Sequence, residues 1–431
     1  MRIDKLRIKN FKGFEEKVFE FPEQFTVLIG DNGTGKSSSL DALAIATGAY
    51  LEGIDGVSKR FIEKDEIRRK SFSRQSYEYQ LPVQIEAWGS ISGKPYKWMR
   101  FLESPDGRTK RDTKPVKNLA SKHQELVRKG DNSVILPLFV YHGTGRLWAE
   151  HKTKVGFVSG GSRLDGYLDC LSPKSSSKQF LSWYKTYFDA KQKFAHEEDA
   201  AAITAFNETL TSLVGEWQDI AFDFVENDMV GFYKSQEGQL HYLPFRMLSD
   251  GFRNMIGMAA DIAYRCIKLN PHLKENTVKE TPGLVLIDEL DLHLHPNWQK
   301  RIVADLKRVF PNIQFVATTH SAFIVQSLKA GELISLDEET PFQKDPFREG
   351  IEDVAEKFMN VEDVERSEQF KEMEKVAAEY FDLIAKGQNE ATNGKVKELK
   401  KQLDDLELRY SDDPAYVALM KAERASQTKK L

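Results

Sequence analysis

The stretch from Gly30 to Ser37 (GDNGTGKS) combines residue types and a spacing that suit phosphate binding. Its glycines let the backbone curl so that N–H groups point inward, while Lys36 supplies an ammonium group and Ser37 a hydroxyl that can bind Mg²⁺. An apolar run precedes the stretch and a helical pattern follows it, which is the context that this motif requires. We therefore predict a phosphate-binding loop. The residues expected to line it are Asn32, Gly33, Thr34, Gly35, Lys36, Ser37 and Ser38.

Three further residues with catalytic side chains follow other apolar runs. Asp288 and Glu289 come directly after LVLI, and His320 comes after FVATT. At a strand end, Asp288 can hold Mg²⁺, Glu289 can polarise an attacking water, and a neutral His320 can hydrogen-bond the terminal phosphate. Continuous apolar runs are typical of parallel strands that are buried on both faces. We predict Asp288 as a metal ligand and Glu289 and His320 as catalytic residues.

Ser249, Asp250 and Gly251, in the stretch LSDGFRN, stand at the start of a helical run. A serine and a glycine at a helix N-terminus offer free N–H groups, which bind anions such as phosphate. An ordinary helix cap explains Ser249 equally well when the motif is taken alone. Its position shortly before the Asp288–Glu289 pair favours the functional interpretation, so we include the three residues among the nucleotide contacts.

The elements around these motifs can be outlined from periodicity. Apolar and polar residues alternate, or nearly so, over 3–21 and 80–102, which predicts strands. The stretch 104–130 is polar and rich in lysine, and residues 178–225 have a helical pattern. In the tail, apolar residues recur three and four positions apart on both sides of a break at 387–394, which predicts a helical hairpin. The two stripes consist of Phe370, Met373, Ala377, Tyr380, Ile384, Val396, Leu399, Leu403 and Leu406.

Composition limits the kind of protein. The chain has 431 residues and a formal net charge of -4, which argues against a uniformly basic nucleic-acid binder. Two cysteines, Cys170 and Cys266, are too few for a disulfide framework. No apolar stretch approaches the length of a membrane span, and the first residues do not resemble a signal peptide. We expect a cytoplasmic protein with no membrane contact.

Taken in order, the motifs resemble the Walker A, signature, Walker B, D-loop and H-switch of an ABC-type ATPase, with LDLHLHP as the D-loop. The opening LRIKNFKGF and the form DELDLHLHP are similar to the branch that contains RecF, SMC, Rad50 and the overcoming-lysogenisation-defect proteins. More narrowly, the chain resembles the ATPase subunit of Septu-type anti-phage systems (PtuA-like), which also occurs with some retrons. The stretches that carry this narrower resemblance are YHGTGRLW (141–148), SRLDGYLDCL (162–171) and DDPAY (412–416).

The resemblance implies an α/β fold of the ABC-ATPase head type. Such a head has a mixed β subdomain and a parallel sheet that carries the phosphate loop, with helices on its flanks. Here an inserted helical region and a C-terminal helical hairpin would be added. The expected parts are an N-terminal ATPase lobe (1–145), an inserted, largely helical region (146–235), a C-terminal ATPase lobe (236–340) and a helical tail (341–431).

The resemblance also implies ATP and Mg²⁺ as ligands and a site that is closed in trans. Ser249, Asp250 and Gly251 of one copy would reach the nucleotide of a second copy, and Asp291 would face the partner. The expected assembly is a homodimer or a higher oligomer, in which ATP regulates a partner HNH endonuclease and DNA or a phage-derived ligand is sensed. The signature reads Ser-Asp-Gly instead of Ser-Gly-Gly, which adds a carboxylate near a phosphate and bears on hydrolytic competence.

Several alternatives stay open. The chain could instead be a RecF-like DNA-repair ATPase that binds duplex DNA through the basic stretch Arg108–Lys129, or a scaffold that binds ATP without hydrolysing it. Arg146 could sense charge near the nucleotide or anchor a turn. His293 and His295 invite a metal site, which the lack of a third ligand at suitable spacing disfavours. The candidates for the glutamine of the Q-loop, or its substitute, are Gln75, Gln80, Gln84 and Asp65.

Overall fold

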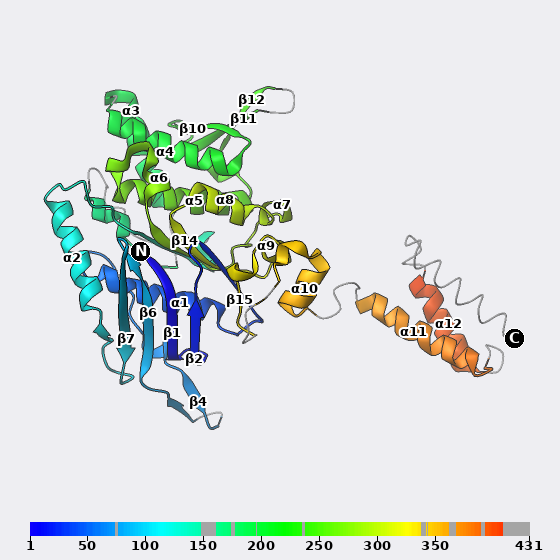
Figure 1. The fold of residues 1–431 in the computed structure, drawn as a ribbon. Coiled ribbons are helices and arrows are strands. Elements are labelled where there is room, and N and C mark those ends of the chain that lie inside the picture. The colour runs from blue at the N-terminus through cyan, green and yellow to red at the C-terminus, as the bar shows by residue number, and fades with distance from the viewer. Residues whose placement is uncertain are drawn as a thin grey trace. The chain divides into compact units, whose positions relative to one another are not determined.

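A computed structural model divides the chain into two compact units, Met1–Val354 and Ala355–Leu431. Figure 1 shows the helices and strands of both units. The structure describes residues 1–73, 76–147, 161–173, 177–194, 196–234, 238–337, 342, 344–361, 368–388 and 393–407.

The N-terminal strands form an antiparallel sheet, as their alternating pattern predicts. The strand order is β2-β1-β6-β7-β8, and every second residue of β6 is buried. A tight turn at Ser92 and Gly93 joins β6 to β7, and a separate hairpin pairs β4 with β5. The strands are β1 (Arg2–Phe11), β2 (Phe14–Glu20), β4 (Arg69–Ser71), β5 (Tyr77–Tyr79), β6 (Val83–Ile91), β7 (Lys94–Leu102) and β8 (Lys110–Asp112).

A second sheet carries the glycine-rich loop and the acidic pair. Its order is β15-β3-β14-β13-β9, and all four pairings are parallel. All residues of β3, β9, β13 and β14 are buried, which confirms the prediction drawn from the continuous apolar runs. The carboxyl ends of five strands therefore meet along one edge. The strands are β3 (Phe25–Ile29), β9 (Leu138–His142), β13 (Gly283–Ile287), β14 (Ile313–Thr318) and β15 (Leu333–Ser335).

Helices cover both faces of the parallel sheet (Figure 1). α1 contacts both sheets and lies between them, whereas α5 contacts β9. The lysine-rich stretch 104–130 forms β8 and the helix α2, which packs against α1 and buries Val116 and Ala120. Within the described ranges, no helix has both the length and the apolar composition of a membrane span. The helices around the two sheets are α1 (Lys36–Leu51), α2 (Lys114–Arg128), α5 (Asp250–Leu269), α6 (Thr277–Glu280), α7 (Pro296–Gln299), α8 (Ile302–Val309) and α9 (Ala322–Gln326).

The region between the two lobes is helical only in its first part. α3 and α4 pack against each other and against α5, with the rings of Phe180, Trp183 and Phe206 in contact. The predicted helical pattern is wrong from Trp217 onward, because the burial period changes to two at Ile220 and Phe222. These residues belong to the sheet β10-β11-β12. The elements are α3 (Ser177–Phe194), α4 (Glu197–Val214), β10 (Trp217–Asp223), β11 (Asp228–Lys234) and β12 (Leu240–Pro244).

The second unit contains the predicted helical hairpin. α11 and α12 contact each other, and Val396, Leu399 and Leu403 of α12 are buried. The stretch DDPAY lies outside the described residues. Of the predicted stripes, the side chains outside the described residues are Phe370, Met373 and Leu406. The helices after β15 are α10 (Ile351–Met359), α11 (Glu368–Ala385) and α12 (Gly394–Glu407).

Candidate active site

The glycine-rich loop joins β3 to α1 in a conformation that only glycine adopts readily. Gly30, Gly33 and Gly35 have φ angles of 146°, 90° and 108°. A Cβ atom on Gly35 would lie 2.5 Å from Cζ of Phe14, the last residue of the FKGF stretch. The Phe14 ring therefore packs against the loop at Gly35 and leaves no room for a side chain at that position. Backbone N–H groups in such a loop are well placed to bind phosphate oxygens.

Lys36 places its ammonium group at this loop. Its Nζ donates to the carbonyl oxygens of Gly30 at 2.6 Å and Asp31 at 2.9 Å. Burial lowers the pKa of Lys36, and the nearby carboxylates of Asp337 and Asp31 oppose that effect. A partly buried ammonium group that is bonded to two carbonyl oxygens gains from an anionic ligand. The arrangement suits a phosphate group.

Ser37 and Asp288 meet beside Lys36, although they are distant in sequence. Ser37 Oγ donates to Asp288 Oδ1 at 3.1 Å, and Thr318 Oγ1 donates to the same carboxylate oxygen at 2.7 Å. Asp288 is buried. A hydroxyl and a buried carboxylate are the oxygen ligands that Mg²⁺ prefers, so the two residues fit the predicted metal site. Bound there, Mg²⁺ would neutralise charge on the phosphates.

Glu289 stands in a strained backbone position next to this pair. Its φ angle is 51°, a region that residues with side chains rarely occupy. Thr318 fixes the position, because its Oγ1 accepts from Glu289 N–H at 2.8 Å and its carbonyl oxygen accepts from Leu290 N–H at 2.8 Å. Strain of this kind persists where the surroundings enforce it and is frequent at active sites. Glu289 follows the carboxyl end of β13, so it lies at the same edge of the parallel sheet as the glycine-rich loop, which follows β3.

His320 lies two residues after β14 ends at Thr318, and it is exposed. Its backbone N–H donates to Asp291 Oδ1 at 3.2 Å, and Thr319 Oγ1 donates to the same oxygen at 2.6 Å. The side chain of Asp291, expected to face a partner, is thus turned toward the end of β14 of its own chain. Asp291 thus connects the D-loop, which follows β13, to the segment that carries His320.

The LSDGFR turn lies against the segment that follows Glu289. Ser249 is exposed at the N-cap position of α5 and makes no side-chain capping bond, so ordinary capping does not account for it. A Cβ atom on Gly251 would lie 2.2 Å from the carbonyl oxygen of His293. The carboxylate of Asp250 pairs with the guanidinium of Arg253. This pairing offsets the negative charge that the sequence adds to the turn.

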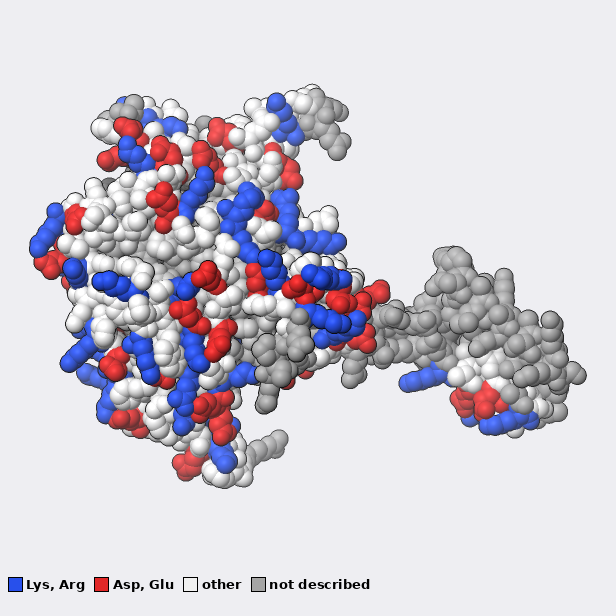
Figure 2. Space-filling view, viewed as in Figure 1, with Lys and Arg blue, Asp and Glu red and all other residues white. Residues whose placement is uncertain are grey.

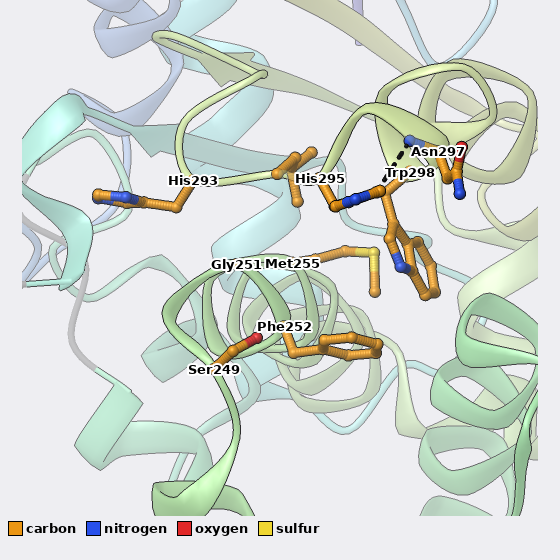
Figure 3. A pocket seen from close by; sticks show the side chains of 9 residues that line it. Ser249, Gly251, Phe252, Met255, His293, His295, Asn297 and Trp298 are labelled. Carbon is orange, nitrogen blue, oxygen red and sulfur yellow. Dashed lines mark hydrogen bonds between the residues drawn. The ribbon is translucent and has the colours of Figure 1, made fainter.

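The turn and the D-loop enclose a surface hollow of about 300 Å³ (Figure 3). The rings of Phe252 and Trp298 meet edge to face at one side of it, with centroids 5.2 Å apart. His293 and His295 point in different directions, and His295 Nδ1 accepts from Asn297 N–H at 3.3 Å. Among the described residues, no cluster of three or more metal-binding side chains occurs.

The three Q-loop candidates that the structure describes lie in different segments of the N-terminal sheet region. Asp65 is exposed in a short 3-10 turn, and Gln84 lies within β6. The side-chain amide of Gln80 donates to the Glu78 carbonyl oxygen at 3.3 Å. Gln75 and the side chain of Arg146 lie outside the described residues.

Comparison with known proteins identifies the type of protein. A family model described as "AAA domain" matches residues 5–215, and a second, described as "AAA domain, putative AbiEii toxin, Type IV TA system", matches residues 168–326. The "Retron Vc95 probable ATPase" of Vibrio cholerae is 25% identical over 390 residues, which cover 78% of this chain and 74% of that protein. The "Retron Ec83 probable ATPase" of Escherichia coli is 25% identical, with coverages of 76% and 70%. The Septu protein PtuA of Bacillus mycoides is also 25% identical and covers 78% of this chain, but the match spans only 40% of PtuA.

The chain is an ATPase related to those of retron and Septu systems. The predicted resemblance is therefore confirmed, and so is the predicted enzyme class.

The stretch SRLDGYLDCL, which carried part of the narrower resemblance, ties several elements of this ATPase together. Arg265 of α5 donates to the carbonyl oxygens of Gly166 and Leu168, each at 2.9 Å. Arg163 donates to the carbonyl oxygen of Leu269 at 2.8 Å, and Tyr167 OH donates to that of Pro137 at 2.8 Å. The stretch therefore connects α5 to the segment before β9, which is a structural role.

Two residues of the ATPase site were missed by sequence reasoning. Thr318 orients both Asp288 and Glu289, and the carboxylate of Asp337 lies at the entrance of the glycine-rich loop. A hydroxyl at the end of the FVATT run was the available signal for Thr318. Nothing local marked Asp337, since its position depends on β15 lying next to β3.

Proposed function

We propose that this ATPase binds ATP and Mg²⁺ between the glycine-rich loop of one copy and the LSDGFR turn of a second copy. In the resulting homodimer, ATP occupancy controls a separate effector, an HNH endonuclease, in anti-phage defence. The single observation that carries the trans arrangement is the exposed, uncapped Ser249 beside a surface hollow at the D-loop. The defence setting rests on the retron and Septu relatives and on the PtuA-like motifs.

Each residue of the site has a defined task in this proposal. Lys36 leaves the two carbonyls and binds phosphate oxygens, and Ser37 with Asp288 holds the metal. Glu289 orients the attacking water and accepts its proton, while His320 donates a hydrogen bond to the terminal phosphate. The partner's Ser249 and Gly251 supply a hydroxyl and a helix N-terminus on the opposite side of that phosphate. A closed site of this kind also excludes bulk water.

Ser249→Arg is expected to abolish ATP-dependent dimerisation, because the longer side chain fills the hollow where the partner's nucleotide is placed. ATP affinity of the monomer should change by no more than about twofold, since surface substitutions away from a contact cost little. Hydrolysis should fall by about 100-fold with the loss of transition-state contacts. Light scattering with ATP and Mg²⁺ measures the mass, and a nucleotide titration measures the affinity.

The matched control is Ser182→Arg, at an exposed serine of α3. It should dimerise and hydrolyse ATP like the wild type. A wild-type protein that stays monomeric with ATP and Mg²⁺, or a Ser249→Arg variant that dimerises normally, contradicts the proposal.

The RecF-like alternative has less support. It relies on positive charge in the stretch Arg108–Lys129, but Lys110 pairs with Glu103, and Arg111 pairs with the buried carboxylate of Glu52 at 3.2 Å. Figure 2 shows basic and acidic side chains interspersed on the visible face, without a large region of one sign. Duplex binding that neutralises many phosphates needs an extended basic surface.

A further inference from the structure

The strand β15 brings a carboxylate to the entrance of the glycine-rich loop. Leu336 N–H donates to the carbonyl oxygen of Ile29 at 2.9 Å, so the pairing of β15 with β3 continues up to the start of the loop. Asp337 then lies beside Gly30, and its Oδ2 accepts from Asp31 N–H at 2.9 Å. The fit is close, because a Cβ atom on Gly30 would lie 2.9 Å from that oxygen.

The negative charge of Asp337 acts on Lys36. Lys36 Nζ donates to the carbonyl oxygens of Gly30 and Asp31, the same two residues that the Asp337 carboxylate adjoins. The carboxylate therefore lies close to the ammonium group, and it opposes the lowering of the Lys36 pKa by burial. Asp288 and Glu289 have tasks in the proposed reaction, whereas Asp337 has none. Lys36 is the residue expected to reach the outer phosphates, so a carboxylate that acts on Lys36 also acts on those phosphates.

We propose that Asp337 is a specificity-determining residue whose negative charge weakens nucleotide binding in proportion to the number of phosphate charges. This inference rests on the proposed nucleotide site at Lys36. Repulsion between like charges grows with each added phosphate, so the penalty is largest for ATP and smallest for AMP. Asp337 is exposed, so solvent and salt reduce the penalty without removing it. Because the affinity for ATP is weaker, the fraction of sites that hold ATP changes with the ATP concentration instead of staying saturated.

The alternative is that Asp337 only positions the loop through the hydrogen bond from Asp31. Asp337→Asn separates the two roles, because the amide oxygen can still accept that bond while the charge is lost. Asp337→Ser serves as a second neutral variant with a hydroxyl acceptor. Under the charge role both variants bind ATP more tightly, whereas under a positioning role they bind it equally or more weakly.

The test measures dissociation constants of ATP, ADP and AMP by calorimetry in the presence of EDTA, where hydrolysis does not occur. Asp337→Asn should bind ATP about fivefold more tightly than the wild type, with a smaller gain for ADP and the smallest gain for AMP. The gain should shrink at high ionic strength. The matched control is Asp345→Asn, because Asp345 also accepts one backbone N–H, that of Ala330 at 2.9 Å, but lies away from the loop. Its affinities should equal those of the wild type.

Unchanged or weaker ATP binding by both neutral variants overturns the inference, and so does an equal gain for ATP and AMP. Thermal unfolding of each variant shows whether it is folded. The variant Lys36→Ala shows whether a negative result concerns Asp337 alone or the proposed nucleotide site as a whole. If Lys36→Ala binds ATP like the wild type, the nucleotide site itself is misplaced; if it loses ATP while Asp337→Asn gains nothing, only the role of Asp337 is wrong.

Discussion

Replacing Glu289 with glutamine is expected to lower ATP hydrolysis by about 10²- to 10³-fold, because the general base that accepts the proton of the attacking water is lost. ATP binding should be retained, since glutamine has the same shape and Asp288 and Lys36 are unchanged. Phosphate release under saturating ATP and Mg²⁺ measures the rate, and a nucleotide titration measures the affinity. With hydrolysis blocked, the ATP-bound dimer should accumulate.

The control for this prediction is Glu20→Gln, an exposed glutamate that pairs with Lys5 on the antiparallel sheet. It removes one negative charge far from the loop and should hydrolyse ATP at the wild-type rate. A Glu289→Gln variant that hydrolyses ATP normally contradicts the assignment of the base. Equal, negligible hydrolysis by the variant and the wild type favours the interpretation of the chain as a non-hydrolysing scaffold.

Replacing Lys36 with alanine is expected to weaken ATP binding by about 100-fold, because charge-assisted hydrogen bonds to two phosphates are lost. AMP, whose single phosphate lies farther from the ammonium group in this proposal, should be affected much less. Lys64→Ala is the control, since Lys64 is exposed and pairs with Asp106. Calorimetric titration of both variants with ATP and AMP measures the effect. Unchanged ATP affinity in Lys36→Ala places the nucleotide elsewhere.

The parts of the site that lie close together in sequence could be predicted well. The glycines, Lys36 and Ser37 occupy one loop whose geometry follows from residue types, and the apolar runs before Asp288 and His320 indicated buried parallel strands. The ends of such strands are forced to one edge of a sheet, whatever their order. This is why residues far apart in sequence could be expected in one site.

The features of the site that the sequence did not predict depend on the order of the strands and on the directions of side chains. Asp337 reaches the loop only because β15 pairs with β3, and a sequence does not reveal that neighbour. The pairing of Asp250 with Arg253 and the inward turn of Asp291 depend on rotamers. The helical assignment failed at Trp217–Asp223, because large aromatic residues continue from the helix into the strand and conceal the change of period.

The most direct test of the trans arrangement mixes two inactive variants, Lys36→Ala and Ser249→Arg. Each variant alone should have very low ATPase activity, the first because its loop binds ATP weakly and the second because its turn cannot close the partner's site. A mixed dimer contains one complete site, formed by the loop of the Ser249→Arg copy and the turn of the Lys36→Ala copy. Equal mixing should therefore restore activity to at most about half of the wild-type value, because each mixed dimer has one complete site instead of two. A mixture that stays as inactive as its components would contradict the account.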